Sequence, residues 1–185
     1  MSLERDRARL LELLRSLSFE RRKVVLASGK ESEFYVDCKR TALTAEGHVL
    51  VGRLLLDRIR RLRPLPRGVG GLTLGADPLA SAVAMASWLE YERWRAQAQP
   101  EEAGPERAGG MGRPHPPSTI DAFIVRQEPK GHGTGQWIEG RKTIPDGSRV
   151  AVLEDVVTSG GSALKAIEAA GVPLRALFTR KDFIP

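Results

Sequence analysis

The sequence predicts an α/β fold in which a parallel sheet is flanked by helices. Short apolar segments typical of strands alternate with amphipathic helical segments over residues 70–179, and this alternation is typical of a parallel sheet covered by helices. The chain has 185 residues, 41% of them hydrophobic, which is enough to form a core without disulfide or metal cross-links. We therefore expect residues 1–185 to form a single domain.

Two helices and one short strand are expected in the N-terminal third. Leucines recur at helical spacing over residues 3–17, where Ser2 can cap the helix. The same apolar pattern covers residues 45–62, with Thr44 in front of it and a proline shortly after it. Between the two helices, residues 34–37 are expected to form a strand.

Strands and helices alternate in the remainder of the chain. Residues 70–74 have the composition of a buried strand, and Asp77 and Pro78 are suited to cap and to begin a helix over residues 78–90. Further strands are expected at residues 120–125, 150–153 and 174–179, and a further helix is expected over residues 162–170, ended by Gly171.

Residues 91–118 interrupt this alternation. Nine of the nineteen residues from 100 to 118 are proline or glycine, so no apolar periodicity remains there. We expect a flexible, Pro/Gly-rich surface excursion within the domain, not a domain boundary.

The net charge of +6 does not by itself indicate a nucleic-acid-binding protein. The excess lies in residues 1–67, which carry +7, whereas residues 68–185 carry −1. Aromatic residues make up only 5% of the chain, so the interleaved basic and aromatic residues of many nucleic-acid binders are missing. We do not expect nucleic acid as a partner.

The sequence also indicates a cytoplasmic protein. Cys38 is the only cysteine, which excludes an internal disulfide and agrees with a reducing compartment. The first residues are charged and are not followed by the apolar segment of a signal peptide. The longest mostly apolar stretch, residues 78–89, is far shorter than the ~20 residues of a membrane span, so no membrane is expected as a partner.

The most informative segment is residues 150–162. An apolar strand ends in two acids, Glu154 and Asp155, and a loop of small residues then leads into a helix. Backbone N–H groups and hydroxyls at a helix N-terminus bind a phosphate dianion, and the two acids can accept hydrogen bonds from hydroxyls. A ribose 5-phosphate presents both groups. The loop has neither the lysine of a Walker A motif nor Gly-x-Gly-x-x-Gly spacing.

A second motif begins where the expected strand 120–125 ends. This basic loop, residues 126–142, contains cations together with Gly131, Gly133 and Gly135. Such a composition suits a mobile segment that closes over a polyanion.

Residues 150–162 resemble the signature for 5-phosphoribosyl pyrophosphate (PRPP) in type I phosphoribosyltransferases. Within that superfamily, the chain most resembles the orotate phosphoribosyltransferases, over most of its length outside residues 91–118. It is carried by Ser28-Gly29-Lys30 with Phe34-Tyr35, by residues 74–79, and above all by residues 126–140. It implies the type I phosphoribosyltransferase fold, a parallel sheet flanked by helices with an N-terminal hood of helices and strands.

The resemblance implies a reaction and roles for individual residues. The reaction transfers the phosphoribosyl group of PRPP to orotate, giving orotidine 5′-phosphate and pyrophosphate in de novo pyrimidine (UMP) biosynthesis. The residues implied in catalysis are Lys130, His132 and Asp155. Those implied in PRPP binding are Arg126, Gln127, Lys130, His132, Glu154, Asp155, Val156, Val157, Thr158, Ser159, Gly160, Gly161 and Ser162. Those implied in orotate binding are Thr158, Lys30, Phe34 and Tyr35.

The same resemblance implies Mg²⁺ as the cofactor and a homodimer as the assembly. Substrate oxygens would hold most of the Mg²⁺, so no residue is assigned as a dedicated metal ligand. The basic loop would reach into the neighbouring subunit's site.

The sequence departs from the family pattern in three places. Gln127 stands where the family usually has a lysine, and residues 75–78 lack the lysine that many members carry in that turn. After residue 170, about one strand–helix unit of the family pattern is missing. In the family this unit includes an arginine that binds orotate. We do not expect Arg180 to replace it.

These departures leave two alternatives to the enzyme open. One is a non-catalytic regulator on the same fold that senses PRPP or a nucleotide, or binds RNA. The other is a phosphoribosyltransferase for another base. Phe34 and Tyr35 also have a purely structural interpretation, as core residues.

Overall fold

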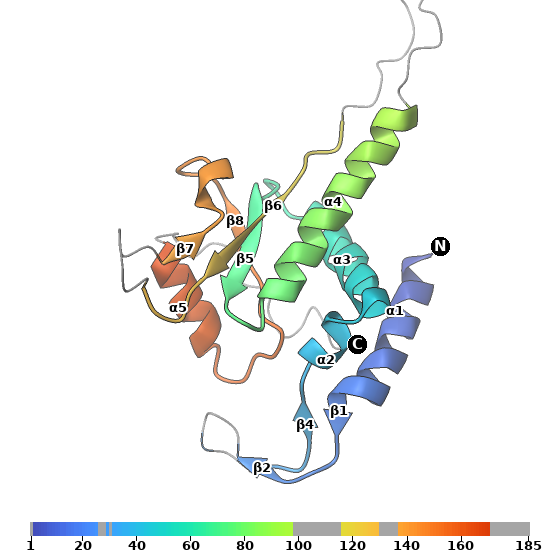
Figure 1. Ribbon diagram of the computed structural model, residues 1–185, viewed down its shortest axis with the longest axis vertical. Helices are drawn as coiled ribbons and strands as arrows, with labels where there is room; N and C mark the ends of the chain where they lie inside the picture. Colours follow the sequence, from blue (N-terminus) through green and yellow to red (C-terminus); the bar gives the residue numbers. More distant parts are fainter. Residues whose placement is uncertain (1, 26–28, 30, 98–115, 130–136, 171–185) are drawn as a thin grey trace, which may run out of the picture.

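The computed structural model describes residues 2–25, 29, 31–97, 116–129 and 137–170. Within these ranges the chain forms a mixed α/β fold whose central sheet is flanked by helices (Figure 1), which confirms the expected fold class. The expected strand at 174–179 and the helix stop at Gly171 lie outside the described residues. Among the described helices, none combines the length and apolar character that crossing a bilayer requires.

Both capped helices of the N-terminal third are present. Helix α1 (Leu3–Leu13) begins after Ser2, whose side chain accepts a hydrogen bond from Arg5 N, and continues into a π-helical turn, η1 (Leu14–Ser18). Helix α3 (Ala45–Arg60) begins after Thr44, whose side chain accepts from Gly47 N. Each hydroxyl satisfies a backbone N–H that the first helical turn leaves without a partner.

Short strands and a short helix connect α1 to α3. Strand β1 (Phe19–Glu20) pairs antiparallel with β4 (Tyr35–Val36), and β2 (Val24–Val25) pairs antiparallel with β3 (Glu31–Ser32). The strand expected at 34–37 is therefore present but shorter. One turn of helix, α2 (Lys39–Ala42), follows β4 directly.

The central sheet has the order β7-β6-β5-β8. Strand β5 (Gly68–Leu72) lies between β6 (Asp121–Val125) and β8 (Val150–Val152) and runs parallel to both. The expected strand at 70–74 lies two residues too far along the chain, because Thr73 and Leu74 form a turn. Strand β7 (Ile138–Glu139), antiparallel to β6, was not predicted.

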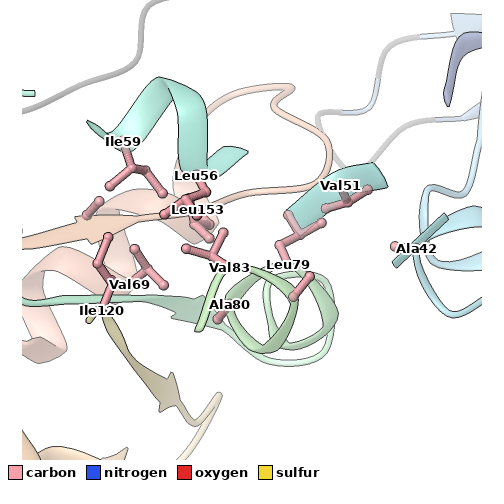
Figure 2. Packing of buried hydrophobic residues seen from close by; sticks show 12 residues of the cluster. Ala42, Val51, Leu56, Ile59, Val69, Leu79, Ala80, Val83, Ile120 and Leu153 are labelled. Carbon is pink, nitrogen blue, oxygen red and sulfur yellow. The ribbon is translucent and has the colours of Figure 1, made fainter. Parts of the chain in front are cut away.

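The two long helices after β5 and β8 cover opposite faces of the sheet. Helix α4 (Asp77–Gln97) packs with α3 over one face, in the cluster of Figure 2 that contains Ile59, Val69 and Val83. Helix α5 (Gly161–Ala170) contributes Ala166 to a second cluster with Phe123. Burial of each large apolar side chain in these clusters stabilises the fold by roughly 2 kcal/mol.

Helix α4 differs from the expected helix at both ends. It begins at Asp77, so that residue is the first residue of the helix and not its cap. It also continues to Gln97, so residues 91–97, expected to belong to the flexible excursion, are helical. Ring contacts from Tyr91 to Trp88 and Trp94, with centroids 5.4 and 6.0 Å apart, accompany the extension. The proline- and glycine-rich residues 98–115 lie outside the described residues.

One buried serine joins α4 to the beginning of β6. Ser87 is 1% exposed; its Oγ accepts a hydrogen bond from Ile120 N at 3.1 Å and lies 3.3 Å from Ile120 O. The same hydroxyl lies 2.8 Å from Ala84 O within the helix. The polar backbone of Ile120 is therefore satisfied inside the core, as buried N–H groups require.

Candidate active site

The carboxyl ends of three parallel strands meet at one edge of the sheet. The turn after β5 (residues 73–76), the start of the basic loop after β6 (residues 126–127) and the segment after β8 (residues 153–160) all begin there. In open parallel sheets this edge is where ligands bind. The two motifs found in the sequence are thus brought together with the turn after β5.

The acid pair follows β8 directly. Asp155 Oδ1 accepts a hydrogen bond from Val156 N at 3.0 Å, which fixes the side chain toward its own loop. Burial, and then the negative charge of Asp155, raise the pKa of Glu154 above the usual value of a glutamate. Two adjacent, partly buried carboxylates favour a ligand with hydroxyl donors or a bound cation.

The acid pair packs against the turn after β5. A Cβ atom on Gly75 would lie 2.3 Å from Asp155 Oδ1 and 2.8 Å from Asp155 Cγ, so a larger residue at this position would displace the carboxylate from where it lies. The Thr73–Leu74 peptide bond in this turn is cis. Further along, Asp77 Oδ1 is buried and has no hydrogen-bond partner among the described residues, and burial raises the pKa of Asp77. A buried oxygen without a partner marks a position where a ligand or ion can supply one.

The phosphate loop, residues 156–162, connects the acid pair to α5. Val156, Val157, Thr158, Ser159 and Ser162 are all exposed. Gly160 has a φ of +80°, which glycine adopts without strain, and its carbonyl accepts the first helical hydrogen bond, from Leu164 N. Gly161 N points to Ser159 Oγ at 3.4 Å. The exposed N-terminus of α5 can therefore receive an anion.

The first two residues of the basic loop, Arg126 and Gln127, have different hydrogen-bond partners. Arg126 binds Glu139 on β7, with its Nε and Nη2 at 3.1 and 2.6 Å from Glu139 Oε1. Gln127 Nε2 donates to Thr73 O at 2.9 Å and so ties the loop to the turn after β5. Lys130 and His132, the other cationic candidates, lie outside the described residues.

The candidates for base binding lie on and beside β4. Phe34 is 53% exposed and stacks on Phe19, with centroids 5.9 Å apart, so the interpretation of Phe34 as a core residue is wrong. Tyr35 is half-buried under the guanidinium of Arg22, whose Cζ lies 4.4 Å from the ring centroid. Thr158 lies in the phosphate loop, and Lys30 lies outside the described residues.

Two residues just after β4 reach the acid pair and were not predicted. Lys39 Nζ lies 2.8 Å from Asp37 Oδ1 and 3.9 Å from Asp155 Oδ2. Cys38 Sγ lies 3.6 Å from Asp155 O, and burial, with the charge of Asp155, raises the pKa of the thiol to about 11. A thiol with this pKa stays protonated near neutrality, so Cys38 is not suited to act as a nucleophile.

Comparison with known proteins identifies the family. No family model matches the chain. The orotate phosphoribosyltransferase of Sorangium cellulosum (strain So ce56) is 41% identical over 207 aligned residues, which cover 97% of this chain and 94% of that protein. The chain belongs to the orotate phosphoribosyltransferase family.

Solved orotate phosphoribosyltransferases share the fold. The Mycobacterium tuberculosis H37Rv enzyme in complex with Fe(III) dicitrate is 37% identical, with a TM-score of 0.60, and the match covers 90% of this chain and 76% of that one. Its complex with PRPP is 36% identical, with a TM-score of 0.57 and coverage of 90% and 74%. The predicted family and fold are therefore confirmed, and the alternative of a non-catalytic regulator is not favoured.

The alignment with the Sorangium protein contains gaps in this chain. The 207-residue alignment with the Sorangium protein is longer than the 185 residues of this chain, so the relative has residues where this chain has none. The position of the gap, after residue 170, stays a prediction because residues 171–185 lie outside the described residues.

Proposed function

We propose that this chain is an active orotate phosphoribosyltransferase, which transfers the phosphoribosyl group of PRPP to orotate in pyrimidine nucleotide synthesis. The observation that carries the proposal is the packing of Asp155 on Gly75, because it joins the acid pair and the phosphate loop to the turn after β5. The 41% identity between this chain and the orotate phosphoribosyltransferase of Sorangium cellulosum supports the same conclusion.

The acid pair and the phosphate loop together fit the ribose 5-phosphate part of PRPP. Glu154 and Asp155 would accept hydrogen bonds from the two ribose hydroxyls, and residues 156–162 would surround the 5-phosphate with backbone N–H groups and hydroxyls. As pyrophosphate leaves, positive charge develops on the ribosyl ring, and the Asp155 carboxylate would stabilise that charge.

The basic loop would act on the departing pyrophosphate. Arg126 and Gln127 lie at its described end, and Lys130 and His132 complete the proposed set. Donors of this kind stabilise the charge that accumulates on the leaving group, and closure of the loop would exclude water from the reactive intermediate. Lys130 and His132, with Asp155, are the residues we propose for catalysis.

Orotate would bind between β4 and the phosphate loop. Phe34 offers an exposed ring face, Tyr35 lies next to it, and Thr158 provides a hydroxyl from the phosphate loop. Lys30 would supply a positive charge for the orotate carboxylate. Planar aromatic bases stack favourably on such exposed rings.

The oxygen atoms at this edge of the sheet fit Mg²⁺, which prefers oxygen ligands. Asp77 Oδ1 is buried and has no hydrogen-bond partner among the described residues, and Glu154 and Asp155 present further carboxylate oxygens. PRPP oxygens would provide most of the ligands and Asp77 an additional one. The ion would supply positive charge to offset that of the leaving pyrophosphate.

We further propose that the enzyme is a cytoplasmic homodimer whose basic loop contributes to the partner's site. The single cysteine supports a reducing compartment. Sedimentation equilibrium measures the assembly, and mixing a Lys130→Ala chain with an Asp155→Asn chain tests the shared loop. Recovery of activity in the mixture would come from one intact site per mixed dimer, and two inactive chains that stay inactive when mixed would contradict sharing.

The enzymatic proposal is tested by incubating the purified chain with orotate, PRPP and Mg²⁺ and following the loss of orotate absorbance. We expect orotate-dependent release of pyrophosphate and formation of orotidine 5′-phosphate. Absence of turnover at high protein concentration would contradict the proposal. A panel of other bases, assayed in the same way, decides the base specificity.

Replacing Gln127 by lysine is expected to improve PRPP use. The ammonium can still reach Thr73 O, and it adds a positive charge where the pyrophosphate is expected. We expect kcat/KM for PRPP to rise about fivefold, which corresponds to ~1 kcal/mol. Steady-state rates at varied PRPP measure this change.

The matched control for this substitution is Gln127→Met, which removes the hydrogen bond to Thr73 O without adding charge. We expect kcat/KM for PRPP to fall in that variant. A Gln127→Lys enzyme no better than Gln127→Met would show that position 127 does not contact the leaving group.

A further inference from the structure

The segment Asp37-Cys38-Lys39 connects the proposed base-binding strand to the acid pair. It begins directly after β4, and its last residue begins α2. In Figure 1 the loop after β8 passes beside α2, and the contacts of Cys38 and Lys39 with Asp155 place the two segments against each other. The N-terminal hood therefore supports the acid that lies at the centre of the proposed site.

Asp37 holds both the backbone and the side chain of Lys39. Asp37 Oδ1 accepts hydrogen bonds from Lys39 Nζ at 2.8 Å and from Lys39 N at 3.2 Å. The hydrogen bond to Asp37 raises the pKa of Lys39, with a further contribution from Asp155, so the ammonium keeps its charge. A lysine held at both its backbone and its ammonium has given up the freedom that an exposed lysine normally retains.

Lys39 is also the only basic residue within 4 Å of the Asp155 carboxylate among the described residues. The neighbouring cation on α2, Arg40, is directed elsewhere: it binds Glu20 and approaches Asp37 Oδ2 at 3.8 Å. The Asp155 carboxylate is 12% exposed, so the charge opposite it is screened less than at an open surface.

We propose that Lys39 is a positioning residue for PRPP: its ammonium orients the Asp155 carboxylate and offsets part of the negative charge that the anionic substrate meets at the acid pair. This inference rests on the proposed function. Lys39 acts through Asp155, with Val156 N and the space above Gly75 setting the other sides of the same carboxylate.

The test compares Lys39→Met with wild type in PRPP affinity, measured by calorimetry, and in steady-state kinetics. We expect the Kd and KM for PRPP to rise about tenfold, ~1.4 kcal/mol, while kcat changes less than about threefold. The difference in Kd is expected to shrink at high salt, because it arises from charge. A purely structural defect would lower kcat and stability without this salt dependence.

Three further variants complete the design. Lys39→Arg keeps the charge and is expected to restore PRPP affinity, whereas Arg40→Met removes a cation from the same helix and is expected to resemble wild type. Asp37→Asn releases Lys39 and is expected to raise the KM for PRPP in the same direction, which keeps the inference testable should Lys39→Met fold poorly. Wild-type PRPP affinity in Lys39→Met, or an equal loss in Arg40→Met, overturns the inference.

The outcomes also separate this inference from the proposed function. A wild-type chain that binds PRPP without consuming orotate contradicts the enzymatic proposal, and the comparison of PRPP affinities still decides the role of Lys39. A wild-type chain that does not bind PRPP contradicts both.

Discussion

Replacing Asp155 by asparagine is expected to reduce kcat/KM for PRPP by about 100-fold, which corresponds to ~2.7 kcal/mol of transition-state stabilisation. The amide can still accept the hydrogen bond from Val156 N, so the loop geometry is kept. What is lost is the negative charge beside the ribosyl ring and one acceptor for a ribose hydroxyl. The expected loss is therefore larger in kcat than in KM.

The matched control for Asp155→Asn is Asp57→Asn on α3. Asp57 binds Arg61 one turn further along the same helix, so the substitution removes an equal charge away from the sheet edge. We expect wild-type kinetics and a change in stability below about 1 kcal/mol in this variant. An Asp155→Asn enzyme within about threefold of wild type would show that Asp155 does not act on the ribosyl group.

Replacing Gly75 by alanine is expected to lower kcat/KM for PRPP about 30-fold, or ~2 kcal/mol. The new methyl group would lie 2.3 Å from Asp155 Oδ1, so the carboxylate or the turn after β5 must move. If Asp155 acts on the ribosyl group as proposed, displacement of its carboxylate by about 1 Å is enough for a loss of this size. Initial rates at varied PRPP, with thermal unfolding measured in parallel, test the prediction.

Two comparisons isolate the contact between Gly75 and Asp155. Gly147→Ala places alanine at a φ of +77° in open space, so it is expected to lower stability by about 1 kcal/mol and to leave activity unchanged. Adding Gly75→Ala to Asp155→Ala is expected to have little further effect, because the group that the methyl displaces is already absent. Independent, multiplying losses in that double variant would contradict the contact as the cause.

Local sequence signals predicted much of the fold. Ser2 and Thr44 cap their helices as expected, because a cap depends on residues within one turn. Strand β7 was missed, since two residues beside a glycine-rich segment carry no periodicity, and it forms only by pairing with β6. The prediction ended helix α4 too early, at residue 90, because the proline- and glycine-rich segment after it was expected to begin at residue 91.

In the candidate site, too, local features could be predicted from the sequence and long-range contacts could not. Glu154, Asp155 and the phosphate loop are contiguous, so their chemistry could be inferred from one segment. The contacts that organise them join distant parts of the chain: Cys38 and Asp155 are 117 residues apart, and Thr73 and Gln127 are 54 apart. No spacing rule predicts such pairs, so Lys39 gave no signal beyond a charge after a strand.

The buried hydrogen bond between Ser87 and Ile120 has a consequence for how this chain can vary in length. It joins α4 to β6 ahead of the point where the helix ends, so the register of the sheet does not depend on the number of residues between Gln97 and β6. Changes in the length of the chain between Gln97 and β6 are therefore expected to leave the sheet edge that carries the candidate site unchanged.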